Sequence, residues 1–387
     1  MTPKIARFLA EQRLPTPCLV LDLDVVEANY RALEAAMPDA RIYYAVKANP
    51  APEILQLLVR LGSYFDIASV AEAEMVLAAG ASPERLSYGN TIKKMSDIAR
   101  AHALGVRLFA FDSEAELEKI AAAAPGARVF CRILTSNEGA DWPLSRKFGC
   151  DLDMARDLLL RAAALPLVPF GVSFHVGSQQ KDPGQWDVAL AAVAHLFQEL
   201  EAEGVELAMV NLGGGFPTRY RSAVPESGVY GQTIFDSLRR HFGNRIPETI
   251  IEPGRGMVGD AGVIESEVVL ISRKSATDPR RWIYLDIGKF GGLAETMDEA
   301  IQYPIARARD GDGDGDSDGD GDGATEAVIL AGPTCDSADV LYEKADYHLP
   351  LSLKIGDRLR ILATGAYTTT YSAIGFNGFP PLQQYCI

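Results

Sequence analysis

Short apolar segments alternate with helical patterns over the first two thirds of the chain. Eight segments rich in β-branched and aromatic residues are separated, in most cases, by stretches in which apolar residues recur every three or four positions. This alternation predicts an α/β fold, a parallel (β/α)8 barrel of the TIM type. The predicted strands are residues 41–46, 64–68, 86–88, 107–111, 128–133, 170–174, 208–212 and 248–251.

The pattern changes after Glu252, where strand-like segments follow one another without long helices between them. The segments VIESEVVLISRK, RWIYLDIG, EAVILAG and DRLRILATGAY predict an all-β C-terminal domain over residues 265–387, after a barrel over residues 25–264. The apolar segment CLVLDL precedes the first barrel strand. We therefore expect residues 1–24 to associate with the β domain.

An acidic low-complexity run, Asp310–Gly323, interrupts the predicted β domain. Its seven aspartates account for nearly half of the net charge of −15. No single register supplies the Asp, Gly and Glu ligands of a calcium loop, so we interpret residues 309–324, approximately, as a disordered, solvated loop. The rest of the chain is only mildly acidic, which argues against nucleic-acid binding.

Composition narrows the class of protein further. No apolar run reaches the roughly 18 residues of a membrane helix, and the N-terminus lacks the apolar stretch of a signal peptide. We therefore expect a soluble, cytoplasmic protein with no membrane partner. The five cysteines lack CxxC spacing and the five histidines are scattered, so the sequence indicates neither a disulfide framework nor a metal site.

Chemically distinctive residues follow seven of the predicted strands, and barrel enzymes form their active sites at these strand ends. Lys47, in YYAVKANP, follows the first strand. It is either an exposed strand cap or an amine that burial activates as a nucleophile toward carbonyls. The other residues at strand ends are Asp66, Ser69, Asn90, Arg132, His175, Ser178, Gly213–Gly215 and Glu252–Arg255.

The loops after the seventh and eighth strands indicate a phosphate ligand. Barrels frequently bind phosphate with these two loops, which here carry Gly213–Gly215 and Arg255, although a glycine run is more often only a tight turn. Phosphate beside a lysine suggests pyridoxal 5′-phosphate, whose aldehyde forms a Schiff base with lysine. Glu252 would then keep the pyridine nitrogen protonated, the alternative being a surface salt bridge.

Nine segments resemble the motifs of one family. The segments are YYAVKANP, FDIASVAE, YGNTIKK, SRKFG, SFHVGSQ, NLGGGFP, EPGR, GPTCDSAD and GAYTTTYSAIGFNGF. In this order they resemble fold-type III PLP-dependent decarboxylases, the alanine-racemase-like group, and most closely its short bacterial ornithine or ornithine/lysine decarboxylases. Phe290 stands where the eukaryotic enzymes have a phenol, which marks the bacterial branch. The Asp-Gly run is absent from the family pattern.

The resemblance implies roles for individual residues. Lys47 would hold the cofactor covalently, His175 would stack on its ring, Glu252 would pair with the ring nitrogen, and Cys335 would manage protonation; these are the implied catalytic residues. The implied cofactor-binding residues are Lys47, Asp66, Arg132, His175, Ser178, Gly214, Gly215, Glu252, Gly254, Arg255 and Tyr367. Glu72 matches a family position that supports Lys47 and the cofactor.

The resemblance also implies an activity and a partner. The expected reaction is decarboxylation of L-ornithine to putrescine, with some conversion of L-lysine to cadaverine, by a homodimer in which Cys335 and Asp336 reach the partner's site. The implied substrate-binding residues are Asp336, Asp298, Glu295 and Phe376.

Three alternative assignments are a diaminopimelate decarboxylase, a racemase and a non-catalytic relative, and each is less favoured by a sequence feature. Diaminopimelate decarboxylases carry Cys-Glu-Ser where this chain has Cys335-Asp336-Ser337, and racemases use an arginine in place of Glu252. A non-catalytic relative would be expected to lack Lys47, Cys335 or Asp336, and all three are present.

Overall fold

The computed structural model describes residues 1–142, 147–308 and 324–387. Two compact units make up the chain: Glu27–Pro217 with Val224–Gly256, and Met1–Val26 with Thr218–Ala223 and Met257–Ile387. We call the first the barrel unit and the second the β unit. The Asp-Gly run predicted as a disordered loop lies outside the described residues.

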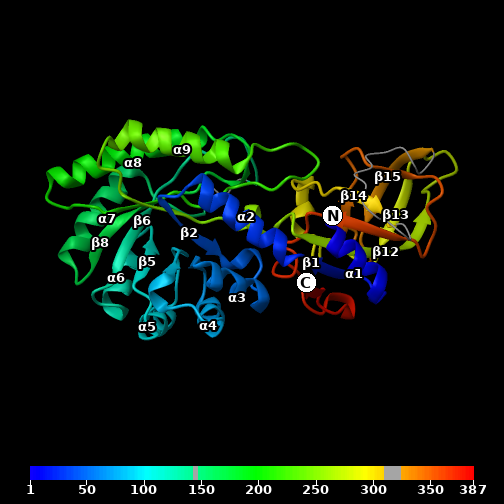
Figure 1. Cartoon of the computed structure of the whole chain (residues 1–387), viewed down its shortest axis with the longest axis horizontal. Helices are drawn as coiled ribbons and strands as arrows, with labels where there is room; N and C mark the ends of the chain where they lie inside the picture. Colours follow the sequence, from blue (N-terminus) through cyan, green and yellow to red (C-terminus); the bar gives the residue numbers. More distant parts are fainter. Residues whose placement is uncertain (143–146, 309–323) are drawn as a thin grey trace. The chain divides into compact units, whose positions relative to one another are not determined.

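A closed barrel of eight parallel strands forms the first unit (Figure 1), which confirms the predicted fold class. Its strand order is β10-β11-β2-β3-β4-β5-β6-β8. The bounds are β2 Ala40–Ala45, β3 Tyr64–Ile67, β4 Leu86–Tyr88, β5 Leu108–Phe111, β6 Arg128–Arg132, β8 Val168–Ser173, β10 Met209–Asn211 and β11 Glu248–Ile251. Each predicted strand corresponds to one of these.

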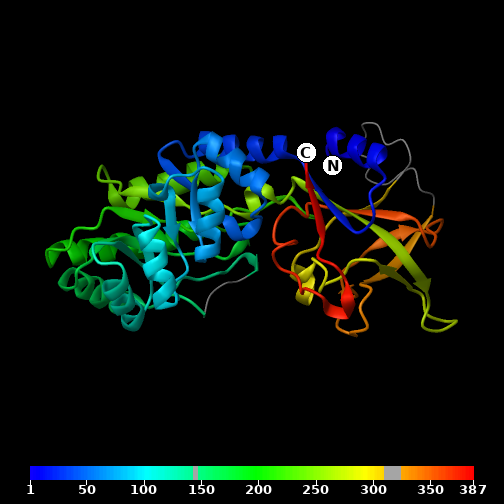
Figure 2. The same ribbon diagram turned by 90° about the horizontal axis from the view of Figure 1, so that it is seen from below.

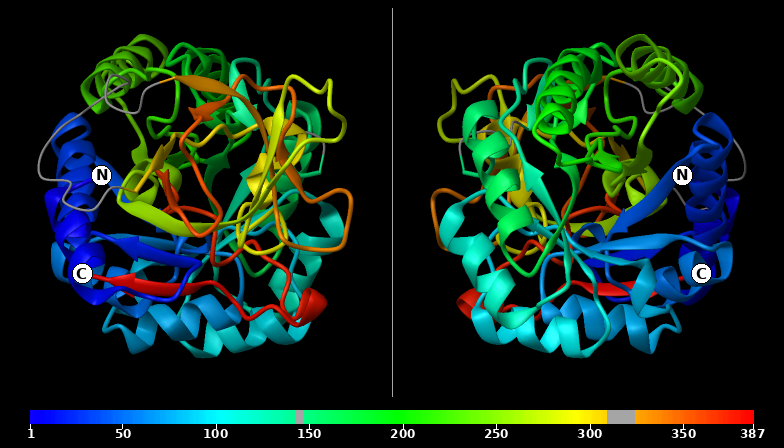
Figure 3. Two further views of the ribbon diagram at one scale, coloured as in Figure 1. Left: turned by 90° about the vertical axis from the view of Figure 1, so that its right-hand side faces the viewer. Right: turned by 90° about the vertical axis from the view of Figure 1, so that its left-hand side faces the viewer.

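Helices cover the outside of the barrel (Figure 3, right). Their bounds are α2 Leu23–Ala36, α3 Pro52–Leu61, α4 Val70–Ala78, α5 Met95–Ala103, α6 Glu114–Ala123, α7 Leu152–Ala164, α8 Gln185–Ala202 and α9 Ser227–Phe242. The one-turn helix α10 Arg255–Val258 follows the last barrel strand. Short 3-10 turns occupy η1 Val46–Ala48 and η2 Pro83–Arg85. A side pair of strands, β7 Ala140–Trp142 and β9 Ser178–Gln180, was not predicted.

Local sequence explains where several of these helices begin and end. Ser69 caps α4 by accepting a hydrogen bond from the Glu72 N–H at 3.2 Å. The Glu72 carboxylate reaches back to accept a hydrogen bond from the N–H of Ala68, the residue before the cap, at 2.6 Å. Gly62 ends α3 with φ +90°, a conformation that glycine adopts without strain. These contacts fix the backbone at the end of α3 and at the start of α4, on either side of β3.

Large apolar side chains fill the interior of the barrel. The set comes from β2, β5, β6, β10 and β11 and comprises Tyr43, Leu108, Ala110, Phe130, Met209 and Ile250. A barrel of eight strands has room only for side chains, so this interior is packed rather than open. The chemistry is therefore confined to the rim.

The β unit is built on a nine-stranded sheet, which confirms the predicted β domain. In Figure 2 β1 runs beside β19, and the two pair in parallel, so both ends of the chain meet in this sheet. The bounds are β1 Cys18–Leu21, β12 Gly262–Ser272, β13 Arg281–Leu285, β14 Ile305–Arg307, β15 Thr325–Ala331, β16 Val340–Tyr342, β17 His348–Pro350, β18 Arg358–Leu362 and β19 Gln383–Cys386, with helix α1 Pro3–Gln12 and 3-10 turns η3 Ala294–Glu299 and η4 Phe376–Gly378.

No helix in the described part of the chain is long and apolar enough to cross a membrane.

Candidate active site

Lys47 and Asp66 form an ion pair at the rim of the barrel. Lys47 lies in η1, directly after β2, and its Nζ is 2.9 Å from Oδ2 of Asp66 on β3. The Asp66 side chain is 5% exposed, whereas that of Lys47 is 49% exposed. The other carboxylate oxygen, Oδ1, is buried and accepts no hydrogen bond from a described residue. A buried oxygen of this kind requires a donor, which a bound ligand can supply.

Glu252, directly after β11, is held by Asn211 at the end of β10. Asn211 Nδ2 donates to Glu252 Oε1 at 2.5 Å. Burial, and next the nearby charge of Asp66, raises the pKa of Glu252 to about 7, while Lys47 lowers it. Because burial disfavours the charged carboxylate, a cationic partner is needed to keep it ionised at neutral pH. A protonated pyridine nitrogen is such a partner.

His175 lies two residues after the end of β8. Burial, then the charges of Arg132 and Lys47, hold the pKa of His175 well below its usual range. Its Nδ1 accepts a hydrogen bond from the Gly177 N–H at 3.0 Å, so the ring proton resides on Nε2. A neutral aromatic ring at the rim is suited to stacking against a flat ligand.

One cationic group and three neutral hydrogen-bonding groups lie in the segments expected to bind phosphate. Arg255 begins α10, is 3% exposed, and donates from Nη2 to Ser178 Oγ at 3.1 Å. The N–H groups of Gly214 and Gly215 donate to no described residue. A guanidinium, a hydroxyl and two available N–H groups make a donor set that fits phosphate oxygens.

Packing explains why this loop contains glycine. A Cβ on Gly213, which has φ +67°, would lie 2.2 Å from the Phe174 carbonyl oxygen. A Cβ on Gly214 would lie 2.7 Å from the Glu252 carbonyl oxygen and 3.1 Å from His175 Nε2. The tight-turn alternative therefore accounts for Gly213, while side-chain-free Gly214 leaves room beside His175. Gly254 lies in the same rim segment as Glu252.

Arg132 and Glu72 contribute in different ways. Arg132 ends β6, and burial lowers its pKa, an effect that the carboxylates of Glu252, Asp112 and Asp66 oppose. Arg132 therefore adds positive charge to a rim that contains several acidic groups. Glu72 engages the backbone at the start of α4, as described above.

The remaining expected site residues belong to the β unit, where two loops bring some of them together. Cys335 and Asp336 are exposed in the loop between β15 and β16. Asn377, in η4, donates from Nδ2 to Cys335 Sγ at 3.3 Å. The neighbouring Phe376 ring packs edge-on against Phe290, with ring centroids 5.2 Å apart.

Asp339, which the sequence analysis did not single out, fixes the Cys335 loop. Its buried carboxylate accepts hydrogen bonds from the Lys289 N–H, at 2.8 Å, and from the Thr334 hydroxyl, at 2.7 Å. A Cβ on Gly288 would lie 2.1 Å from the Asp339 carboxylate. The Asp339 side chain therefore connects the segment DIGKFGG, residues 286–292, to the segment GPTCDSAD.

Three acidic residues of η3 differ in availability. Glu299 accepts hydrogen bonds from three backbone N–H groups, which lower its pKa although burial opposes them. Glu295 is buried, whereas Asp298 is exposed and has a left-handed backbone with φ +52°. Tyr367 also has positive φ, +56°. Asp298 is thus the carboxylate of this turn that is open to a ligand.

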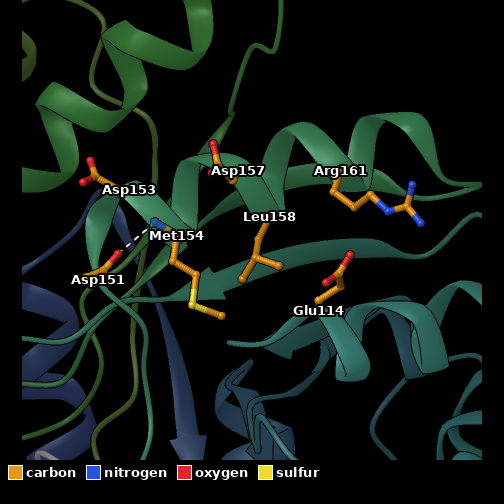
Figure 4. A pocket seen from close by; sticks show the side chains of 7 residues that line it. All are labelled: Glu114, Asp151, Asp153, Met154, Asp157, Leu158 and Arg161. Atoms are coloured by element: carbon orange, nitrogen blue, oxygen red, sulfur yellow. Dashed lines mark hydrogen bonds between the residues drawn. The ribbon is translucent and has the colours of Figure 1, made fainter.

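A pocket of about 590 Å³ lies away from these residues, between α6 and α7 (Figure 4). Its lining includes the acidic residues Asp151, Asp153 and Asp157 and the cation Arg161. It shares no residue with the rim. Among residues 1–142, 147–308 and 324–387, no group of three or more His, Cys, Asp or Glu side chains is placed to hold a metal ion.

The barrel and its rim define the class of protein: an α/β-barrel protein with a lysine, a buried carboxylate, a neutral imidazole and a phosphate donor set on one rim. These residues fit pyridoxal 5′-phosphate, because its aldehyde, its ring nitrogen and its phosphate each have a matching group.

Comparison with known proteins identifies the family. Residues 23–259 match the pyridoxal-dependent decarboxylase, pyridoxal binding domain. The lysine/ornithine decarboxylase of Selenomonas ruminantium is 36% identical over 384 residues, which cover 98% of this chain and 91% of that protein. The chain belongs to the family of pyridoxal-dependent decarboxylases, and its cofactor is pyridoxal 5′-phosphate.

Solved structures agree with this assignment. SrLDC in complex with PLP and cadaverine has a TM-score of 0.86 at 34% identity, covering 100% of this chain and 94% of that chain. The lysine/ornithine decarboxylase from Vibrio vulnificus complexed with putrescine has a TM-score of 0.86 at 29% identity, covering 100% and 99%.

Proposed function

We propose that this protein decarboxylates the basic amino acid L-ornithine to putrescine, and L-lysine to cadaverine to a smaller extent. The observation that carries the proposal is the rim arrangement in which Lys47 pairs with Asp66 beside a Glu252 whose pKa is raised by burial. The decarboxylases from Selenomonas ruminantium and Vibrio vulnificus, with their diamine complexes, support a diamine product.

Each proposed catalytic residue has a task that its position supports. Lys47 would hold the cofactor through its aldehyde, with Asp66 paired to its amine. Glu252 keeps the ring nitrogen protonated, and His175 supports the ring face. When bound, pyridoxal phosphate accepts the electrons left behind as the carboxylate departs as carbon dioxide. Cys335 then returns a proton to the α-carbon.

The proposed cofactor-binding residues fall into two groups, one near Lys47 and one for the phosphate. Arg132 and Asp66 act near Lys47. The phosphate is bound by Ser178, Gly214, Gly215, Arg255 and Tyr367, and Gly254 is a further cofactor-binding residue. The hydrogen bond between Arg255 and Ser178 supports this, since it orients the guanidinium and the hydroxyl toward a common ligand.

Substrate choice is proposed to depend on Asp336 and Asp298, whose carboxylates bind the distal ammonium group. Asp298 is exposed, whereas Glu295, the other candidate, is buried. Phe376 presents an apolar wall to the substrate. One methylene changes binding by only about 1–3 kcal/mol, so an enzyme that accepts ornithine is expected to accept lysine as well.

A homodimer is proposed because the segment that contains Phe376 is unusually apolar at the surface of the single chain. Ile374 is 83% exposed, and Tyr371, Phe376 and Phe379 are also exposed, next to the exposed Cys335. Such a patch is typical of an interface. Mixing inactive Lys47→Ala protein with inactive Cys335→Ala protein should then restore activity, since one site of each mixed dimer has both residues. No restoration would contradict shared sites.

A competition assay tests the activity. The cofactor-loaded protein is incubated with equimolar ornithine, lysine and meso-diaminopimelate, and putrescine, cadaverine and lysine are quantified, with Lys47→Ala as the control. Putrescine in excess supports the proposal, and comparable cadaverine indicates a dual enzyme. Lysine formed from diaminopimelate as the main product, or no product, would overturn the substrate assignment.

A further inference from the structure

Asn377 makes two hydrogen bonds to the same residue, Cys335. Its Oδ1 accepts the Cys335 backbone N–H at 3.0 Å, and its Nδ2 faces Cys335 Sγ at 3.3 Å. Both residues belong to the β unit. The Asn377 side-chain amide therefore hydrogen-bonds to both the backbone and the thiol of Cys335.

The orientation of the Asn377 amide follows from the first of these bonds. A backbone N–H can bond only to an acceptor, so the amide oxygen must face the Cys335 main chain and the NH2 group must face the sulfur. A thiolate accepts hydrogen bonds more strongly than a thiol, because hydrogen bonds to charged groups are the stronger ones. The contact thus stabilises the sulfur once it has given up its proton.

Both partners are held in place by their own segments. Asn377 has φ +53°, a left-handed conformation that asparagine tolerates better than most residues. Phe376, beside it, packs on Phe290, and the Ala373 N–H donates to the Phe290 carbonyl at 2.9 Å. The Cys335 loop is fixed by Asp339, as described above. The contact therefore joins two anchored segments.

We propose that Asn377 is a positioning residue for Cys335, holding the sulfur in one place and stabilising its ionised form during proton transfer. In that step the S–H bond breaks, a C–H bond forms at the substrate α-carbon, and the electron pair stays on sulfur, facing the Asn377 NH2 group. The role of Cys335 as proton donor rests on the proposed function. The effect of Asn377 on ionisation of the Cys335 sulfur does not depend on that role and can be measured without substrate.

Two variants separate an effect on the sulfur from a scaffolding effect. Asn377→Gly retains the left-handed backbone and removes both hydrogen bonds. Asn377→Asp retains the acceptor for the Cys335 N–H but places a carboxylate oxygen where the NH2 donor was. A role in holding the loop predicts a change only in the glycine variant. A role at the sulfur predicts a larger change in the aspartate variant.

The measurement is the pH dependence of alkylation by iodoacetamide in cofactor-free protein, with modified Cys335 quantified by mass spectrometry. Iodoacetamide reacts with the thiolate, so the midpoint pH of the profile reports ionisation of Cys335. We expect the midpoint to rise by about 0.5–1 pH unit in Asn377→Gly and by more in Asn377→Asp. Gln383→Ala, an exposed substitution on β19, is the control. An aspartate variant that coincides with the wild type would overturn the proposal.

Steady-state kinetics with ornithine distinguish this inference from the proposed function. We expect both variants to lower kcat about 10-fold or more while KM changes less than twofold, since Asn377 acts on proton transfer rather than on binding. If the alkylation profile shifts and kcat does not change, Asn377 does affect ionisation of the sulfur, but the proposal that Cys335 is the proton donor is wrong. An unshifted profile overturns the inference whatever the activity.

Discussion

Asn211 Nδ2 donates a 2.5 Å hydrogen bond to Oε1 of Glu252, and the opposite atom of the same amide, Oδ1, accepts the Gly213 N–H at 2.9 Å. The second bond fixes the amide so that its donor faces the carboxylate. Burial raises the pKa of Glu252, whereas the hydrogen bond from Asn211 lowers it by favouring the ionised carboxylate. Asn211 therefore opposes the cost of burying Glu252.

Replacing Asn211 should impair Glu252. Asn211→Ala removes the donor to the carboxylate and leaves the Gly213 N–H without its acceptor, so we expect kcat/KM to fall about 10- to 100-fold, as for a lost bond to a charged group. Val210→Ala, on the same strand, removes buried volume without touching Glu252 and should retain most of the activity. Equal losses in both variants would assign the effect to strand packing.

Glu252 should make the cofactor-free protein less stable as the pH rises. Its pKa in the folded chain is about 7, above the ordinary value for glutamate, so the folded state holds a proton that the unfolded chain releases. That stability is fully present below about pH 4.5 and is lost as the pH rises through 7. Glu252→Gln cannot ionise, so its thermal midpoint should overtake that of the wild type between pH 5 and 7.

Parallel thermal melts of cofactor-free wild type and Glu252→Gln, from pH 5 to 8, measure this difference. The stability of the variant relative to the wild type is expected to rise by about 2 kcal/mol between pH 5 and pH 7, and by less than about 1 kcal/mol from pH 7 to pH 8. A constant offset at every pH would mean that the carboxylate does not titrate in this window.

A methyl group at Gly89 should disturb the Lys47 ion pair. A Cβ built there lies 2.1 Å from Asp66 Oδ1, so Gly89→Ala must displace the carboxylate that pairs with Lys47. We expect cofactor affinity to fall about 10-fold, measured by absorbance titration with pyridoxal phosphate. Gly228→Ala, in α9, meets no atom within 4 Å and serves as the control. Unchanged affinity in Gly89→Ala would show that Asp66 is not needed for binding.

The sequence predicts the barrel well because its signals are local. Each strand is a short apolar run followed by a helix with apolar residues at regular spacing, and Tyr64–Ile67 and Glu248–Ile251 coincide with predicted segments to within a residue. The residues Lys47 and Glu252 follow from the rule that barrel sites form at strand ends. Strand order in the β unit, such as β1 between β12 and β19, depends on distant pairings that no local pattern encodes.

Residues that support the site were missed for the same reason. Asn211 lies within a predicted strand, and its importance arises only when β10 and β11 are adjacent. Asp339 and Asn377 each act on a segment distant in sequence, through a side-chain to backbone hydrogen bond. The one available signal was the presence of all three in NLGGGFP, GPTCDSAD and FNGF, motifs that the sequence analysis had already noted.

A buried ion pair on the barrel gives a final prediction. The Lys93 side chain is fully buried, with Nζ 3.0 Å from Oε1 of Glu116 in α6, and it also donates to the carbonyl oxygens of Asn90 and Ala110, both at 2.7 Å. Burial lowers the pKa of Lys93 to about 8, against the opposing effect of Glu116. Removing the anion would therefore leave a desolvated cation without its charged partner.

Glu116→Gln should lower the free energy of unfolding of the barrel by about 3 kcal/mol at pH 7, because a buried charge without its partner is strongly destabilising. Glu118→Gln, on the same helix and in an exposed pair with Arg161, should change it by less than about 1 kcal/mol. Urea denaturation followed by circular dichroism compares the two. The deficit of Glu116→Gln should narrow above pH 8, where Lys93 loses its charge, and a deficit that equals that of Glu118→Gln at pH 7 would contradict a stabilising role for the pair.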